Sequence, residues 1–347
     1  MPKNIIVPAR DVYILAGASI VGTKESEGPL GSAFDIHDTS DDKFGADTWE
    51  KAESEMQRRA LEAALAKSKL ADSDIDILLA GDLLNQCIGS NYGLISYDVP
   101  YVGLYGACST CAEGLMLASL LCGSSVARCA SVCSSHNCSA ERQFRYPLEY
   151  GGQRPPTAQW TVTGAGAIIT TAEYADFGKI NCKSEYIPRV ADVLPGCALD
   201  YGITDMGNMG AAMAPAAADT IIRYFRASET EAGDYDLIVT GDLGAEGSSI
   251  LCDLLLDAGY EVGGNYRDCG LMIYDREAQD VHAGGSGCGC SGAVFSSVIL
   301  SKLRTGEAKN VLFIGTGALM SPMSIQQGNS IPGIAHLVHV AAEKYPH

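Results

Sequence analysis

Residues 76–83 and 236–243 of this chain read almost alike, as DILLAGDL and DLIVTGDL. Each is a short, continuous apolar run that ends in Gly-Asp. Such a run is typical of a parallel strand buried on both faces, whose carboxyl end opens onto a site. Each also follows an alanine-rich stretch of helical character, residues 50–69 and residues 211–227. Helix, short polar link and buried strand therefore occur twice, which favours an α/β fold built from two similar halves.

The duplication extends past these strands. The strand-like residues 127–133 have a counterpart in residues 310–314. We therefore predict an N-terminal half over residues 1–175 and a C-terminal half over residues 176–347. Residues 139–161 have no partner in the second half and are rich in Arg, Tyr, Pro and Gly. They predict a long ordered loop over the site, the kind of insertion that often carries specificity.

The charge balance restricts the partners of the chain. With 24 basic and 42 acidic residues, its net charge of −18 repels the phosphates of nucleic acids and anionic lipid headgroups. We expect no nucleic-acid partner. A site for an anionic ligand would have to be made locally, from helix N-termini, backbone N–H groups or clustered arginines.

No stretch reads as a signal peptide or a membrane span. Residues 1–10 lack the charged start, apolar run and cleavage site of a signal peptide, and residues 114–122, the most apolar helical candidate, are too short to cross a bilayer. We expect a protein that stays inside the cell. Its 13 cysteines fall in apolar segments, where reduced cysteine behaves as a small hydrophobic residue.

Cys108 is the strongest candidate for chemistry. It lies in Gly-Ala-Cys-Ser-Thr-Cys, between the apolar residues 99–105 and a helical run over residues 112–123. A cysteine at a strand-to-helix junction faces free N–H groups and the positive end of the helix dipole, which favour a thiolate and stabilise an oxyanion. The alternative is that small residues are needed there to let the helix start against the sheet.

The doubled α/β arrangement, the junction at Cys108 and the strand-like residues 162–167 resemble the thiolase and ketoacyl synthase superfamily. That resemblance implies a thiolase-like fold of two pseudo-duplicated halves in an α-β-α-β-α layering. Longer matches resemble the stage V sporulation protein AD family of spore-forming bacteria. These matches are residues 27–31, 80–86, 134–137, 140–147, 149–153 and 213–220.

The resemblance implies a role in which the chain binds pyridine-2,6-dicarboxylic acid (dipicolinic acid) and helps to move it into the developing spore. It implies no known turnover. It further implies membrane proteins of the same sporulation operon as partners, a homodimer formed through strands at the sheet edge, and a location in the cytoplasm or at the inner forespore membrane. No cofactor is expected beyond the ligand, which calcium accompanies in spores.

Two groups that thiolases use for catalysis are missing from the expected places. Ser286 stands where the histidine of a Gly-His-Pro loop would be, and Phe313 where the later proton-shuttle cysteine would be. The His-Gln-Ala-Asn stretch of ketosynthases is replaced by residues 241–244. We therefore expect no enzyme. An acyltransferase that uses Cys108, or a scaffold within a membrane transport assembly, remain the alternatives. The histidines that could still approach the cleft are His37, His136, His282, His336 and His339.

Dipicolinate is a flat dianion, so its pocket needs donors for two carboxylates and an apolar surface for the ring. Arg142 and Arg145 are the candidate carboxylate ligands, with His136 and Asn137 nearby in sequence. The alternative is that these arginines pair with acidic neighbours at positions 141 and 149 on the surface. The N–H groups at the start of the helix after Cys108 could hold the second carboxylate.

Asp82 and Asp242 end the two duplicated strands, where they could point into the cleft or cap the turn that follows. We include Asp82, Asn85 and Ser286 among the predicted ligand-binding residues. No calcium-loop pattern is present, and we predict no fixed metal site. The spacing of Cys288 and Cys290 does not match that of a zinc knuckle.

Overall fold

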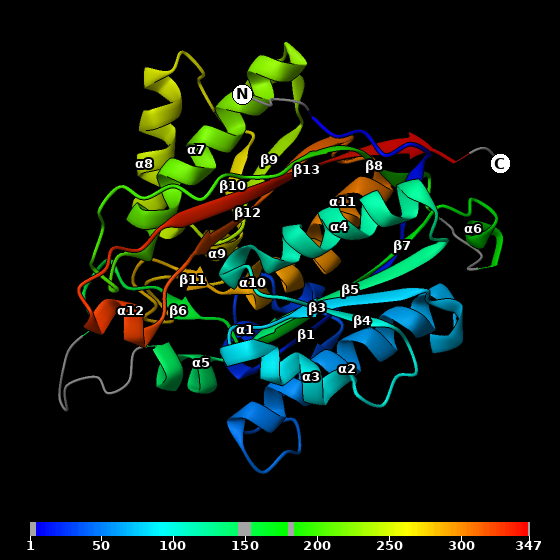
Figure 1. Ribbon diagram of the computed structural model, residues 1–347, viewed down its shortest axis with the longest axis horizontal. Helices are drawn as coiled ribbons and strands as arrows, with labels where there is room; N and C mark the ends of the chain where they lie inside the picture. The colour runs from blue at the N-terminus through cyan, green and yellow to red at the C-terminus, as the bar shows by residue number, and fades with distance from the viewer. Residues whose placement is uncertain (1–4, 145–153, 180–183, 346–347) are drawn as a thin grey trace.

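The computed structural model describes residues 5–144, 154–179 and 184–345 of the chain (Figure 1). The strands are β1 (Val12–Val21), β2 (Ile36–His37), β3 (Ile77–Gly81), β4 (Tyr101–Leu104), β5 (Arg128–Ser135), β6 (Trp160–Thr161), β7 (Gly164–Thr171), β8 (Tyr186–Leu194), β9 (Leu237–Thr240), β10 (Tyr266–Asp268), β11 (Gly285–Ser286), β12 (Asn310–Ala318) and β13 (Gly333–Lys344). The helices are α1 (Thr23–Ser26), α2 (Trp49–Ser68), α3 (Ile88–Leu94), α4 (Thr110–Ser124), α5 (Asn137–Phe144), α6 (Asp176–Lys179), α7 (Met209–Ser228), α8 (Gly244–Asp257), α9 (Cys269–Met272), α10 (Cys288–Val294), α11 (Leu300–Thr305) and α12 (Pro322–Gln326).

Within the described part of the chain, eleven strands form one sheet whose order is the same in both halves. From its edge inward the first half runs β4-β3-β5-β7-β1, and the second runs β10-β9-β12-β13-β8. In each half the first three strands are parallel and the next two pair antiparallel. The halves meet where β1 pairs with β8. The strands with the repeated sequence, β3 and β9, hold equivalent places, which confirms the duplication.

Helices complete five layers (Figure 1). The outer face of the first half of the sheet is covered by α2, with α3 beside it, and that of the second half by α7, with α8 beside it. Between the halves lie α4, α10 and α11, and α4 contacts strands of both. This is the predicted α-β-α-β-α arrangement, and the apolar faces of both half-sheets are buried by it.

Local signals explain the two outer helices. Thr48 accepts the N–H of Lys51 at the start of α2, and Asn208 accepts the N–H of Ala211 at the start of α7, so each helix begins at a side-chain cap. Each ends on a residue in the left-handed conformation. Along α2 the buried positions recur every four residues or so, which places them on one face. They include Ala52, Met56, Ala60 and Ala64.

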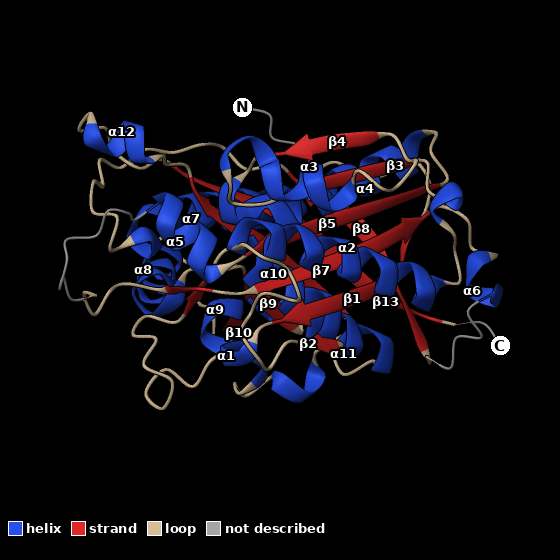
Figure 2. Cartoon of the chain, turned by 90° about the horizontal axis from the view of Figure 1, so that it is seen from below, coloured by secondary structure: helices blue, strands red, loops and turns tan. Residues whose placement is uncertain are grey.

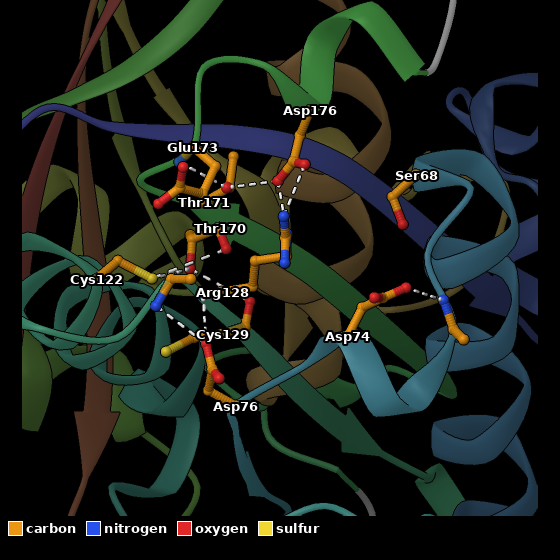
Figure 3. Close-up of polar contacts among 12 residues, drawn as sticks. Ser68, Asp74, Asp76, Cys122, Arg128, Cys129, Thr170, Thr171, Glu173 and Asp176 are labelled. Carbon is orange, nitrogen blue, oxygen red and sulfur yellow. Dashed lines mark hydrogen bonds and ion pairs between the residues drawn. The ribbon is translucent and has the colours of Figure 1, made fainter.

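An equivalent aspartate makes the same hydrogen bond in each of the two repeated units. Asp76 accepts the N–H of Arg128 at 2.9 Å where β5 begins (Figure 3). Asp236 accepts the N–H of Asn310 at 2.9 Å where β12 begins. Each carboxylate therefore fastens a loop before its own strand to the neighbouring strand. The repeat is thus preserved in single hydrogen bonds as well as in strand order.

Residues 139–161 differ from the predicted loop at both ends. The segment begins inside α5 and ends in β6, which pairs with β11 in a small parallel sheet. Residues 145–153, which include Arg145, lie outside the described residues. The β6–β11 pairing joins a segment of the first half to one of the second, and it therefore helps to position the site between them.

The central helix, predicted over residues 112–123, is α4, Thr110–Ser124, and its apolar part is longer than the stretch predicted from sequence. Residues Ala107–Ser124 form the one described helix that is long and apolar enough to cross a membrane, with a mean hydropathy of 1.3 over 18 residues. The stretch that we had considered too short to cross a bilayer, residues 114–122, is half of this length. Of the residues Ala107–Ser124, 67% are buried within the fold. Its apolar character follows from its place in the middle layer, where a half-sheet lies on each side of it.

Candidate functional site

Cys108 lies in a short turn directly before α4, and the turn has an unusual backbone. Ala107 has a φ of +51°, in the left-handed region that costs a non-glycine residue on the order of 1 kcal/mol. The end of β12 packs against this turn, because a Cβ atom on Gly317 would lie 2.7 Å from the carbonyl oxygen of Gly106. Glycine at 317 therefore lets the second half hold the turn that carries Cys108.

A cavity of about 370 Å³ opens beside Cys108. Both halves contribute to its walls, which are largely apolar. The apolar lining residues are Leu83, Ala107, Ala140, Met209, Ala318, Leu319 and Met320. The side chains with a hydroxyl or thiol group are Tyr105, Cys108, Thr161, Ser286, Ser321 and Ser324.

The cavity is neutral in the described part of the chain, where no Arg, Lys or His side chain lines it. Two lining residues, Ala107 and Cys108, stand at the start of the fifteen-residue helix α4. The free N–H groups and the dipole of a helix start carry about half a positive charge. The start of α4 is therefore the source of positive potential in the described part of the cavity.

Asp242 reaches Cys108 from the second half. It follows β9, is fully buried and accepts three hydrogen bonds. The donors are the N–H of Gly287 at 2.7 Å, the hydroxyl of Thr316 at 2.8 Å and the thiol of Cys108. Burial raises the pKa of Asp242, and the three hydrogen bonds act against that rise. The Cys108 thiol thus faces a carboxyl group from the second half of the chain.

Two of the eight predicted ligand-binding residues, Cys108 and Ser286, line the cavity together. Ser286 lies on β11, opposite Thr161 of β6. Asp82 is fully buried beneath the cavity wall and accepts the N–H of Leu84 at 2.8 Å, the turn cap expected of at least one of the paired aspartates. Asn85 is exposed and accepts the hydroxyl of Tyr105 at 3.3 Å, near the cavity mouth.

His136 and Asn137 lie behind the cavity. The Nε2–H of His136 donates to the carbonyl oxygen of Asp42 at 2.8 Å, and its ring lies 5.4 Å from that of Trp49. Burial lowers the pKa of His136, so the buried ring is held in its neutral form. The side-chain amide of Asn137 donates to the carbonyl oxygen of Thr161 at 3.1 Å. Asn137 supports β6, which carries the lining residue Thr161, whereas His136 supports the loop before α2. A direct role of either side chain in binding stays a prediction.

Arg142 pairs with Glu50 of α2. Of its two acidic neighbours in sequence, the one at position 149 lies outside the described residues. Burial opposes the ionisation of Glu50, but the hydrogen bond and the positive charge of Arg142, together with a backbone hydrogen bond, outweigh burial and lower the pKa of Glu50. Arg142 lies two residues after Ala140, a lining residue, on the same helix. Arg145 lies outside the described residues, so the role of both arginines stays a prediction.

Sequence reasoning missed the wall made by residues 319–324 and the contact between Asp242 and Cys108. The first had a signal, because Ser321 caps α12 and Pro322 occupies its first turn, a pattern typical of a helix start. The contact between Asp242 and Cys108 had no sequence signal, because the two residues come from different halves of the chain.

Solved structures of the thiolase superfamily share the fold. An OleA variant from Xanthomonas campestris superposes with a TM-score of 0.59 at 13% identity, over 97% of this chain and 100% of that one. Human mitochondrial 3-ketoacyl-CoA thiolase gives 0.57 at 11% identity, over 97% and 100%. The 3-oxoacyl-(acyl carrier protein) synthase III of Pseudomonas aeruginosa gives 0.54 at 14%, again over 97% and 100%. At such identities the likeness concerns the fold alone.

A closer relationship comes from sequence. The model of the family described as stage V sporulation protein AD matches residues 3–341 of this chain. The stage V sporulation protein AD of Bacillus subtilis (strain 168) is 46% identical over 336 residues, which cover 96% of this chain and 95% of that protein. The resemblance inferred from short motifs is therefore confirmed over almost the full length. This chain belongs to the stage V sporulation protein AD family, whose members are sporulation proteins on a thiolase-like fold.

Proposed function

We propose that this sporulation protein binds dipicolinic acid in the cavity at the start of α4 and assists its import into the developing spore, without chemical turnover. The observation that carries the proposal is the content of the cavity. Cys108 stands at a helix start, as a nucleophile would, but within the described chain no histidine lines the cavity to act as its base. Acyl transfer by a cysteine uses a general base that takes up the proton of the thiol. The cavity itself has the size and apolar walls of a small-molecule site.

The chemistry of the walls suits a flat aromatic acid. Leu83 and Met320 offer apolar surface to a ring from the two halves of the chain. The hydroxyl of Ser286 and the N–H groups at the start of α4 are neutral donors for a carboxylate. In the proposal, Arg142 releases Glu50 when the ligand binds and donates instead to the second carboxylate of the ligand. Calcium, where present, arrives with the ligand, and no fixed metal site is proposed.

Calorimetric titration with dipicolinate tests the proposal. We expect saturable binding to the wild-type protein and weaker binding of picolinate, which lacks one carboxylate. Arg142→Ala and Arg145→Ala should weaken binding about ten-fold or more, because each removes a charge-assisted hydrogen bond, and Cys108→Ala should weaken it less. Arg58→Ala is the matched control, because Arg58 also pairs with glutamates of α2 but lies away from the cavity.

Absence of both heat and a thermal shift at millimolar dipicolinate would contradict the proposal. Equal losses in the Arg142, Arg145 and Cys108 variants, with folding intact, would contradict the order of contributions.

The alternative of an acyltransferase is favoured by one observation, the position of Cys108 at the start of α4 within the cavity. Incubation with acyl-CoA followed by mass spectrometry separates it from the main proposal. A stable acyl adduct on Cys108 would support the alternative. If neither acyl-CoA nor dipicolinate binds, the reading as a scaffold for the membrane proteins of the operon gains support.

The proposed homodimer is supported by the edge of the sheet. Within the described chain β4 pairs with β3 alone, so its other edge is unpaired (Figure 2). Val102 on this strand is 48% exposed, and Tyr92 and Ile95 of the nearby residues 88–95 are also exposed. An unpaired apolar edge strand is a template for pairing with a second copy.

A further inference from the structure

Two carboxyl groups are buried close together behind the cavity. Glu53 of α2 and Asp82 at the end of β3 are both fully buried. Gly89 lies against both, because a Cβ atom there would be 3.2 Å from Oδ2 of Asp82 and 3.4 Å from Cγ of Glu53. Two negative charges this close in a dry interior repel each other, so such a pair is stable when one member carries a proton.

The hydrogen bonds of Asp82 match the ionised form. Its Oδ1 accepts the N–H of Leu84 at 2.8 Å, and its Oδ2 accepts the N–H and the hydroxyl of Ser90 at 2.7 and 2.6 Å. All three partners donate, which suits a carboxylate that can only accept. The proton of the pair therefore belongs on Glu53.

Glu53 has a place for that proton. Its Oε1 accepts the hydroxyl of Ser134 at 3.1 Å, and its Oε2 lies 2.7 Å from Oγ of Ser139. The same Oγ lies 3.2 Å from the carbonyl oxygen of His136. A protonated Oε2 donates to Ser139, which then donates to His136, so both contacts are hydrogen bonds at once. Burial and the charge of Asp82 raise the pKa of Glu53 to about 8, which agrees with this assignment.

Gln57, one turn further along α2, connects the two carboxyl groups. Its side-chain amide donates to Ser90 and to Ser134, each at 2.8 Å. Ser90 donates to Asp82, and Ser134 donates to Glu53. One buried network therefore joins α2 and α3 to the ends of β3 and β5 and to α5.

This network lies between two walls of the cavity. Leu83 follows Asp82 and Ala140 follows Ser139, and both line the cavity. We infer that Glu53 and Asp82 share one proton, which fastens α5 to the end of β3 and holds these two walls in the arrangement that the ligand needs. Glu53 is thus a positioning residue, because it acts on the ligand only through the walls.

No cation among the described residues that face the pair would balance a second negative charge. Glu50 of α2 is itself acidic, and Arg142 of α5 is paired with it. Burial keeps the ring of His136 neutral. The remaining titratable groups that face the pair are Cys87, Tyr101, Tyr105 and Cys288. Loss of the shared proton therefore leaves two negative groups close together, and their repulsion loosens α5. Because the pKa of Glu53 is raised, the network is intact at neutral pH and weakens as the pH rises through about 8.

The pH dependence of dipicolinate binding tests the inference, which in this respect rests on the proposed function. With a pKa of about 8, the protonated fraction of Glu53 falls from about nine-tenths at pH 7 to about one-tenth at pH 9. Calorimetry should therefore show binding to the wild type that is about ten-fold weaker at pH 9. Glu53→Gln should bind equally at both pH values, because its amide stays neutral and can still donate to Ser139.

Glu62→Gln is the matched control. It makes the same substitution on the exposed side of α2, where Glu62 pairs with Arg58, and it should keep the pH dependence of the wild type. The same ten-fold fall in Glu53→Gln would overturn the inference. If that variant does not fold, a wild-type affinity that is equal at pH 7 and pH 9 would overturn it.

Hydrogen exchange without ligand separates this inference from the proposed function. After correction for the intrinsic rate, the amides of α5 should exchange up to about ten-fold faster at pH 9 than at pH 7 in the wild type, and equally fast in Glu53→Gln. An α5 that exchanges equally at both pH values in the wild type would overturn the inference even if dipicolinate binds. If dipicolinate binds at neither pH, the proposed function fails, and the exchange of α5 alone decides the inference.

Discussion

Glu25 should make the stability of the protein depend on pH, and its replacement by glutamine should remove that part of the dependence. The side chain is fully buried, where its Oε1 accepts the N–H of Thr163 at 2.9 Å and the hydroxyl of Tyr274. Its Oε2 is buried without a hydrogen-bond partner among the described residues. Burial outweighs these hydrogen bonds and raises the pKa of Glu25 from 4.5 to about 7.

The sign follows from the direction of this change. A carboxyl group with a raised pKa in the folded state contributes most to stability below its unfolded pKa, and the contribution is lost as the pH rises through the folded pKa. At about 1.36 kcal/mol per pH unit, the interval from 4.5 to about 7 corresponds to about 3 kcal/mol. Burial also raises the pKa of Glu53 to about 8 and that of Asp268 to about 7, so the wild-type protein should lose stability overall between pH 5 and pH 8.

Urea denaturation at pH 5 and at pH 8 measures the effect. Over this interval Glu25→Gln should lose about 2 to 3 kcal/mol less of its free energy of unfolding than the wild type, whatever the absolute cost of the substitution. Glu27→Gln is the control, since Glu27 is exposed two residues away. Parallel pH profiles for the wild type and Glu25→Gln would refute the reasoning.

Three further substitutions test the fold around the site. Asp176→Ala should lower the free energy of unfolding by about 3 kcal/mol, because it removes the ion pair that Asp176 forms with Arg128 at 2.6 Å (Figure 3). An unchanged urea midpoint would contradict this. Val102→Asp should convert dimers to monomers in light scattering, because a charge on the β4 edge opposes strand pairing; an unchanged mass would place the interface elsewhere. Ala107→Gly should raise the free energy of unfolding by about 0.5 kcal/mol, because glycine relieves the left-handed backbone, and a loss of stability would argue against that strain.

The duplicated core was readable from sequence because its signals are local. The predicted helices over residues 50–69 and 211–227 correspond to α2, Trp49–Ser68, and α7, Met209–Ser228. Their caps and apolar spacing lie within the helices themselves. The strand predicted over residues 310–314 continues to Ala318. Gly317 there reads as a turn signal, but it serves close packing of β12 against the turn before α4.

Contacts between segments that are distant in the sequence could not be predicted from local sequence signals. Asp242 and Cys108 meet because two strands of different halves end at the same place, and no pattern in either segment records this. Arg142 pairs with Glu50 because α5 packs against α2, whereas the alternative read from sequence was pairing with its acidic neighbours. The site residues that could be predicted are those whose role depends on their own element, such as Cys108 at the start of α4.

A crystal structure of the protein soaked with dipicolinate and, separately, with acyl-CoA would test the central claim most directly. We expect the pyridine ring between Leu83 and Met320, with a carboxylate near Ser286 and the thiol of Cys108 unmodified beside Asp242. Dipicolinate bound elsewhere, or a thioester on Cys108 after the acyl-CoA soak, would contradict the account.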